Sequence, residues 1–234
     1  MGLHQSHPGM RSEPRHTITP AGSHSECRRR QAIAKKGPPL EEPGNAPILN
    51  IIGEKVALGP QSAELLPLYV KWMNDFEVTR TLAIGLRPMT MEAEQKWWET
   101  ASVRENDVSF TIYERPNLRP IGNTALHKID PTHATAEFGI VIGEKDAWGR
   151  GYGTEAATLM LDYAFTALGL HNVMLRCYAF NDRARRAYLR AGFREFGRRR
   201  ECHRLGPRLS DEIHMDCLST EFDRSILSRF LPEE

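Results

Sequence analysis

The chain has 234 residues, of which 40% are hydrophobic and 26% charged, and its formal net charge at pH 7 is +1. This composition is typical of a globular protein, and so small a net charge provides no general attraction to nucleic acid or to an anionic membrane surface. We therefore expect neither a nucleic-acid nor a membrane partner, although the run Arg198, Arg199 and Arg200 leaves a local electrostatic role open.

The cysteines and the lack of an export signal predict where the protein works. Cys27, Cys177, Cys202 and Cys217 show neither the spacing of metal ligands nor the density of a disulfide framework. The amino-terminal residues contain no apolar signal segment, and no run of the sequence reaches the roughly 18 apolar residues that span a bilayer. We expect reduced thiols, no metal site, and a cytoplasmic protein that is a monomer or a homodimer.

The first 46 residues are rich in proline and glycine and poor in large apolar side chains. Such a segment cannot bury enough apolar surface to offset the loss of chain entropy, so we predict a disordered extension over 1–46. Its basic cluster at 28–36 resembles an organellar targeting signal or a nucleic-acid-binding segment, but nearby glutamates interrupt that pattern. We expect one folded domain over 47–220 and a C-terminal helix or tail over 221–234.

The folded part begins near Asn50 with a predicted strand over 50–60. Two helices follow, over 62–75 and 90–102, and each begins at a hydroxyl side chain that can cap it. The capping residues are Ser62 and Thr90. Segments rich in β-branched and aromatic residues come next, separated by turns, and they predict three antiparallel strands over 107–114, 120–129 and 135–143.

After Gly151 the apolar residues recur every three or four positions as far as Leu168, which predicts a helix with one buried face that ends at Gly169. A strand, a helix, two strands and a last helix capped by Ser219 or Thr220 follow, over 171–179, 182–191, 192–202, 211–218 and 219–231. This order predicts an α/β (α+β) protein, with helices packed on a mixed, mostly antiparallel sheet.

The stretch DAWGRGYGTEA, residues 146–156, places three glycines at alternate positions just before a predicted helix. The first N–H groups of a helix lack partners and its dipole is positive there, so an anion can bind to the backbone alone. Gly149, Gly151 and Gly153 would let a phosphate or pyrophosphate approach without a Cβ in the way. The spacing matches neither a Walker A loop nor the dinucleotide fingerprint, and a turn without a ligand stays open as the alternative.

A second motif, NDRARRAYLRAGF at 181–193, places Asn181, Ala184 and Tyr188 at helical spacing. Together the two motifs resemble the GCN5-related N-acetyltransferase (GNAT) superfamily, whose members carry an R/Q-x-x-G-x-G/A turn and often an N-x-x-A-x-x-x-Y-x-x-x-G-F stretch. Residues 140–156 are similar to the branch that contains the ribosomal-protein and spermidine acetyltransferases. Trp148 stands where the superfamily motif has Arg or Gln, so a side-chain contact from that position is lost.

The resemblance implies the GNAT fold, a sheet splayed between its fourth and fifth strands, with acetyl-CoA as cosubstrate in the gap. In this sequence those strands are 135–143 and 171–179. The resemblance implies that strand backbone pairs with the pantetheine amides, that a side chain at the next helix binds the cofactor arm, and that the turn binds the pyrophosphate. The residues so implied are Ile140, Val141, Ile142, Asn181, Trp148, Gly149, Arg150, Gly151, Tyr152, Gly153 and Thr154.

The implied reaction is direct transfer of the acetyl group to a primary amine through a tetrahedral intermediate. An ammonium group must first lose a proton, and the departing thiolate must gain one. Tyr188 is the candidate general acid and Glu137 the candidate general base, while a backbone N–H near Val141 could polarise the thioester carbonyl. A Tyr188 that only packs on its helix, a solvated Glu137 and deprotonation through a water chain stay open as alternatives.

Of the parts of the predicted site, the one that binds the acceptor amine is the least well defined by the sequence. The family fold builds the substrate wall from the first two helices and their loop, where Asp75 and Glu77 could attract a cationic amine such as a polyamine or an aminoglycoside. Loop carboxylates are commonly solvated, and a protein amino terminus is the other acceptor that we expect. Two alternatives to an enzyme stay open. One is a sensor that binds acyl-CoA without turnover, and the other is a protein-interaction domain on the same scaffold.

Overall fold

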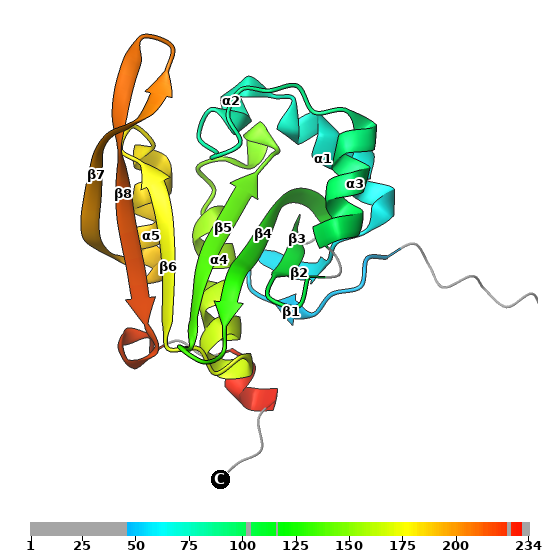
Figure 1. Cartoon of the computed structure of the whole chain (residues 1–234). Helices are drawn as coiled ribbons and strands as arrows, with labels where there is room; N and C mark the ends of the chain where they lie inside the picture. The colour runs from blue at the N-terminus through cyan, green and yellow to red at the C-terminus, as the bar shows by residue number, and fades with distance from the viewer. Residues whose placement is uncertain (1–45, 102–103, 116, 224–225, 231–234) are drawn as a thin grey trace, which may run out of the picture. The chain divides into compact units, whose positions relative to one another are not determined.

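The structure, a computed structural model, describes residues 46–101, 104–115, 117–223 and 226–230. All but the last residue of the extension expected over 1–46 therefore lie outside the described residues. The described chain forms an eight-stranded sheet in the order β1-β2-β3-β4-β5-β6-β8-β7 (Figure 1). The strands are β1 (Ile51–Ile52), β2 (Val56–Pro60), β3 (Val108–Glu114), β4 (Arg119–Asp130), β5 (Thr135–Ile142), β6 (Asn172–Tyr178), β7 (Arg194–Leu205) and β8 (Arg208–Leu218).

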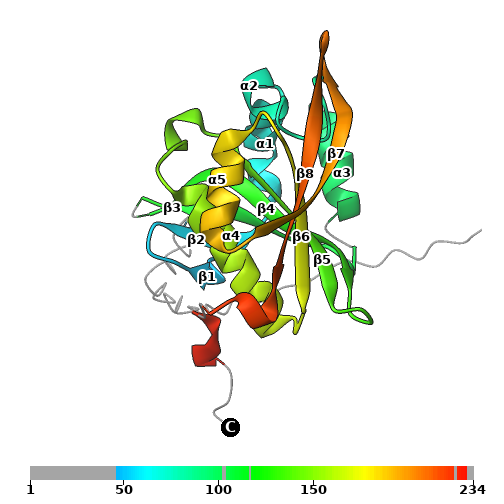
Figure 2. The ribbon, with the colours of Figure 1, turned by 90° about the vertical axis from the view of Figure 1, so that its left-hand side faces the viewer.

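Helices pack on the sheet as the apolar patterning predicts. They are α1 (Leu66–Met73), α2 (Phe76–Thr79), α3 (Met91–Ala101), α4 (Tyr152–Asp162) and α5 (Asp182–Ala191). In Figure 2 α4 and α5 lie on one side of the sheet and α3 on the other. Most apolar residues of α4 are fully buried, so this helix forms the centre of the core. Among the described residues, no helix has both the length and the apolar character needed to cross a membrane.

All neighbouring strands are antiparallel except β5 and β6, which confirms the mixed, mostly antiparallel sheet. β5 and β6 pair over only three residues each, the last pair being Glu137 with Met174. Beyond that point β5 stays paired with β4 as far as Ile142, and β6 stays paired with β8 as far as Tyr178. The sheet is therefore splayed between β5 and β6, as the family resemblance implied.

The first predicted strand is a hairpin, β1 and β2, rather than one continuous strand. Its turn is held by the Glu155 carboxylate of α4, which accepts hydrogen bonds from the backbone N–H groups of Glu54 and Lys55. A Cβ at Gly53 would lie 2.3 Å from Glu155 Oε1, so glycine is needed for this approach. The pattern of apolar residues could not predict a turn that depends on a carboxylate about 100 residues away.

Both hydroxyls predicted to cap the early helices make capping hydrogen bonds. The Thr90 hydroxyl accepts from the Ala93 N–H of α3 at 3.2 Å. The Ser62 hydroxyl accepts from the Glu64 N–H at 3.2 Å and caps the 3-10 turn Ala63–Leu65, which leads into α1. Between these helices the structure adds the short helix α2, which no apolar period predicted. Asp75 caps α2 by accepting from the Glu77 N–H at 2.9 Å.

The helix expected over 219–231 does not form in the described part of that segment, which contains two short 3-10 turns, Ser219–Glu221 and Leu227–Phe230. Ser219, one of the two expected caps, shares a hydrogen bond with His171 Nδ1 at 3.0 Å instead. Asp162 Oδ2 accepts from the N–H groups of Ile226 and Leu227 at 2.6 and 3.0 Å. Because Leu227 is buried in the main core, this part of the C-terminal segment belongs to the domain.

Candidate active site

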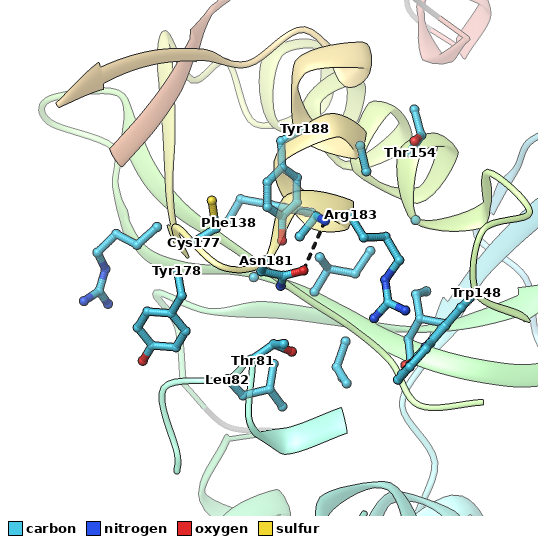
Figure 3. A pocket seen from close by; sticks show the side chains of 18 of the residues that line it. Thr81, Leu82, Phe138, Trp148, Thr154, Cys177, Tyr178, Asn181, Arg183 and Tyr188 are labelled. Atoms are coloured by element: carbon cyan, nitrogen blue, oxygen red, sulfur yellow. Dashed lines mark hydrogen bonds between the residues drawn. The ribbon is translucent and has the colours of Figure 1, made fainter. Parts of the chain in front are cut away.

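A cavity of about 370 Å³ lies where β5 and β6 diverge (Figure 3). Its walls come from β5, β6, the glycine turn, the start of α4, the first turns of α5, β8 and the loop after α2. The cavity brings together both sequence motifs, which are separated by about 30 residues in the chain. The lining residues predicted from the sequence are Glu137, Ile140, Val141, Ile142, Trp148, Gly149, Gly151, Tyr152, Gly153, Thr154, Asn181 and Tyr188.

The glycine turn leads directly into α4 at the cavity wall. Gly149 and Gly151 have φ angles of 76° and 87°, in the left-handed region that favours glycine. Neither the backbone conformation nor the packing of the protein requires a glycine at position 153. Its φ is not positive, and a Cβ there would have only Ile142 Cγ1 as a neighbour, at 3.7 Å. Space beside Gly153 therefore opens into the cavity, next to the N–H groups of the first turn of α4, where an anion is stabilised.

Only alternate residues of β5 direct their backbone groups into the gap. The Gly143 N–H donates to Ile121 O at 2.9 Å. In an antiparallel ladder the backbone N–H and C=O groups of every second residue point to the same neighbouring strand, so those of Val141 also point to β4. Ile140 and Ile142 therefore face the gap. This corrects the expectation that all three residues offer backbone groups to the gap, since those of Val141 face β4. The N–H near Val141 that faces the gap is that of Ile140, and Val141 also lines the cavity.

Trp148 has two partners at the cavity wall. Its indole Nε1 donates to Ile142 O at 2.8 Å. One of the carbonyl oxygens that face the gap therefore already has a hydrogen-bond partner. The guanidinium of Arg183, from the first turn of α5, lies 3.7 Å from the centre of the Trp148 ring. Partial burial and the nearby charge of Arg80 lower the pKa of Arg183, and no described acidic residue forms an ion pair with it. An unneutralised cation therefore stands beside the glycine turn.

Arg150 does not line the cavity, contrary to its place in the motif. Its guanidinium lies 3.6 Å from Glu114 Oε2 and 5.0 Å from the centre of the Tyr152 ring. Glu114 is a buried carboxylate that Arg119 also binds, at 2.7 Å. Arg150 therefore helps to neutralise a buried acid behind the turn, and its side chain is not placed to contact a ligand in the gap.

Asn181 and Tyr188 lie on the β6–α5 side of the cavity. The Asn181 side chain caps α5 by accepting from the Ala184 N–H at 3.2 Å. The Tyr188 ring is buried and makes edge contacts with Phe138 and Phe193, at centroid distances of 6.1 and 6.0 Å. Figure 3 shows it pointing from α5 into the cavity. Burial, with a smaller effect of Cys177, raises the pKa of Tyr188, so the phenol stays protonated at neutral pH.

Glu137 lines the cavity but is already neutralised. Its carboxylate accepts from Arg176 Nε and Nη2 at 2.8 and 2.6 Å, and from Lys128 Nζ at 2.7 Å. Burial raises the pKa of Glu137, but the hydrogen bonds from Lys128 and Arg176 outweigh it and the net pKa is lowered. A carboxylate held in this way is a weak proton acceptor, so the geometry does not favour Glu137 as the general base.

Sequence reasoning missed His127 and Glu212, which also line the cavity. His127 lies on β4 opposite Glu137, and its Nδ1 is 3.4 Å from Asp107 Oδ2. Glu212, buried on β8, lies 3.8 Å from Arg176 Nη1 and 3.2 Å from His214 Nε2. Neither residue belongs to a sequence motif, and only the pairing of the strands brings them to the cavity.

The two carboxylates expected to bind the acceptor do not line the cavity. Asp75 Oδ2 and Glu77 Oε2 both bind Lys145 Nζ, at 2.8 and 2.6 Å. The loop that follows them does form a wall, as the resemblance implied, through Thr81 and Leu82. Asp75 and Glu77 therefore hold this wall in place, and their charge is offset by a lysine.

The chain matches a family model described as an acetyltransferase (GNAT) domain over residues 56–194. It is 24% identical over 173 residues to the uncharacterized N-acetyltransferase p20 of Bacillus licheniformis, covering 72% of this chain and 96% of that protein. It is 32% identical over 136 residues to human alpha/beta-tubulin-N-acetyltransferase 9, covering 51% of this chain and 63% of that protein.

Solved structures show the same fold. The spermidine N-acetyltransferase of Vibrio cholerae, in complex with CoA and spermine, superposes with a TM-score of 0.68 at 22% identity, covering 74% of this chain and all of that one. The matched family model spans more than half of this chain and includes the glycine turn and all of α5. The chain therefore belongs to the GNAT family of acetyltransferases.

Proposed function

We propose that the protein transfers the acetyl group of acetyl-CoA to a primary amine, either that of a small molecule or that of a polypeptide amino terminus. The observation that carries the proposal is the cavity itself, which joins an anion-binding turn, unpaired strand backbone and a protonated phenol in one gap. Relatives named for action on a polyamine and on tubulin support both acceptor classes.

We expect acetyl-CoA to lie along this cavity. The N–H groups at the start of α4 and the Arg183 guanidinium would hold the pyrophosphate. The pantetheine amides would pair with the Ile140 backbone and the Ile142 N–H, because Ile142 O already accepts from Trp148. The Asn181 side chain would bind the same arm. The open space beside Gly153 supports this arrangement, since protein packing gives no reason for a glycine there.

An N–C bond forms and the C–S bond breaks in the reaction, while the ammonium nitrogen loses two protons and the departing sulfur gains one. We assign the first ammonium proton to His127, reached directly or through water, because its imidazole lines the cavity and Asp107 can orient it. Tyr188 supplies a proton to the departing sulfur and regains one from the nitrogen, which loses its second proton as the amide forms. The Ile140 N–H, next to Val141 and facing the gap, would polarise the thioester carbonyl.

A thiol-release assay with acetyl-CoA tests the proposal. The acceptor panel contains polyamines, aminoglycosides, amino acids and peptides with free amino termini. Release of CoA that depends on the acceptor and on Tyr188 supports the enzyme. Tight binding of acetyl-CoA without release for any acceptor would indicate a sensor, and no binding at all would indicate a scaffold without cosubstrate.

A further inference from the structure

The β7–β8 hairpin extends beyond the rest of the sheet at the cavity. β6 ends at Tyr178, whereas β7 and β8 stay paired with each other as far as Leu205 and Arg208. Figure 1 shows the hairpin rising past the end of β6. The hairpin therefore offers a two-stranded surface next to the place where an acceptor would enter.

One row of paired residues joins the cavity wall to the hairpin. Glu212 of β8 pairs with Tyr178 of β6 on one side and with Arg199 of β7 on the other. Paired residues carry their side chains on the same face of a sheet, and Tyr178 and Glu212 both line the cavity. Arg199 therefore continues the cavity wall onto the hairpin.

A second arginine lies farther along this face. Arg208 is four residues before Glu212 on β8, and residues two or four apart in a strand share a face. His203, between the two arginines, stacks on Tyr178 with ring centroids 3.7 Å apart. Arg204 lies next to His203 in the strand, so its side chain is on the opposite face.

The charge of the hairpin is largely unneutralised. Residues 198–211 contain five arginines and two carboxylates. Within the described chain, Arg198 is the one of these arginines that forms a salt bridge, with Asp211 at 3.1 Å. Asp211 also accepts from the Glu201 N–H at 2.9 Å. Arg199 and Arg208 are both exposed, so their charges are available to a partner.

We propose that this face, Arg199 and Arg208 with His203 between them, binds an acidic stretch of a polypeptide acceptor. The proposal rests on the function proposed above, and it favours a polypeptide over a polyamine because two free arginines repel a polycation. A strand rises about 3.4 Å per residue, so Arg208 lies about 14 Å beyond Glu212. An extended peptide with its amino group in the cavity would then place residues 3–6 on this face.

Three ten-residue peptides test this inference. They share their first two residues and a free amino terminus, and they carry Asp/Glu, Ser/Gln or Lys at positions 3–6. We measure kcat/KM by thiol release, and the binding of N-acetylated copies, which cannot react, by fluorescence anisotropy. Wild-type protein should prefer the acidic peptide over the neutral one by about tenfold, mainly through KM, and should lose the preference at high salt.

The variant Arg199→Gln/Arg208→Gln should abolish this preference while the affinity for acetyl-CoA is unchanged. Arg204→Gln is the control, because it removes one arginine charge of the same hairpin from the opposite face and should keep the preference. The inference is overturned if acidic and neutral peptides perform alike, if spermine is the better acceptor, if Arg204→Gln has an equal effect, or if an RNA oligonucleotide displaces the peptide. Failure of the proposed function looks different, since no acceptor in the panel would then release CoA from acetyl-CoA, whether or not acetyl-CoA binds.

Discussion

The guanidinium of Arg183 lies over the Trp148 ring, 3.7 Å from its centre. Trp148 occupies the motif position where the family usually has an arginine or glutamine. α5 thus brings a cation to the place where the motif lacks one, and the indole face holds it there. Trp148 and Arg183 belong to different motifs of the sequence and meet only in the fold.

Arg183→Gln is expected to weaken CoA binding by about 10- to 100-fold, because it removes a charge-assisted contact to the pyrophosphate. Isothermal titration calorimetry with CoA measures the loss. Acetyl-pantetheine, which lacks the phosphates, should bind the variant and the wild type equally. Arg186→Gln, on the same helix but outside the cavity lining, is the control. Equal weakening of acetyl-pantetheine binding would contradict the role of Arg183.

Tyr188→Phe should lower kcat and kcat/KM by about 10²–10³-fold, since it removes the proton donor for the departing sulfur. The ring keeps its contacts with Phe138 and Phe193, so the affinity for acetyl-CoA and the thermal midpoint should barely change. Steady-state kinetics and calorimetry on the same preparation separate these effects. Nearly normal turnover would mean that Tyr188 only packs.

The pH dependence of kcat/KM distinguishes the two candidate bases. A protonated base cannot accept the ammonium proton, so activity should fall as the pH falls through the pKa of that base. This fall at low pH is the acidic limb of the profile, and His127→Gln should remove it and lower the rate. Glu137→Gln should leave the limb in place, because Lys128 and Arg176 already lower the pKa of Glu137. A limb that disappears only in Glu137→Gln would reverse the assignment.

Gly153→Val should abolish acetyl-CoA binding without unfolding the protein. A side chain at this position meets little of the protein and projects toward the space proposed for the pyrophosphate. Circular dichroism and calorimetry would show an intact fold and no binding. Gly151→Val differs, because its φ of 87° is strained for valine, and it should also lower the melting temperature. Unchanged affinity in Gly153→Val would remove the pyrophosphate from the turn.

Asp162→Asn should lower the free energy of unfolding by about 1–3 kcal/mol, the range for weakening a buried hydrogen-bonding group. One Asp162 oxygen accepts two backbone N–H groups of the C-terminal segment, and the amide that replaces it offers a poorer acceptor. Urea denaturation measures the change, with the exposed Glu105→Gln as control. A loss no larger than that of the control would show that the C-terminal segment does not depend on this contact.

The parts of the fold that follow from local pattern could be predicted from the sequence. Alternation, helical periodicity and capping hydroxyls located most strands and the major helices, and the glycine turn and Tyr188 came from motifs. Several failures depend on distant partners. Glu155 makes a hairpin from one predicted strand, Lys145 neutralises Asp75 and Glu77, and Arg176 neutralises Glu137. Side-chain type predicts a charge, but only the fold determines whether that charge is free.

The contact of Lys145 with Asp75 and Glu77 connects segments about 70 residues apart. One end is anchored just before the glycine turn, and the other on α2, whose following loop faces the same cavity. A single ammonium group therefore ties the segment before the glycine turn to the helix that leads into the loop on the opposite wall of the cavity. Loss of Lys145 would leave two neighbouring carboxylates without their shared partner and remove a link between these two walls.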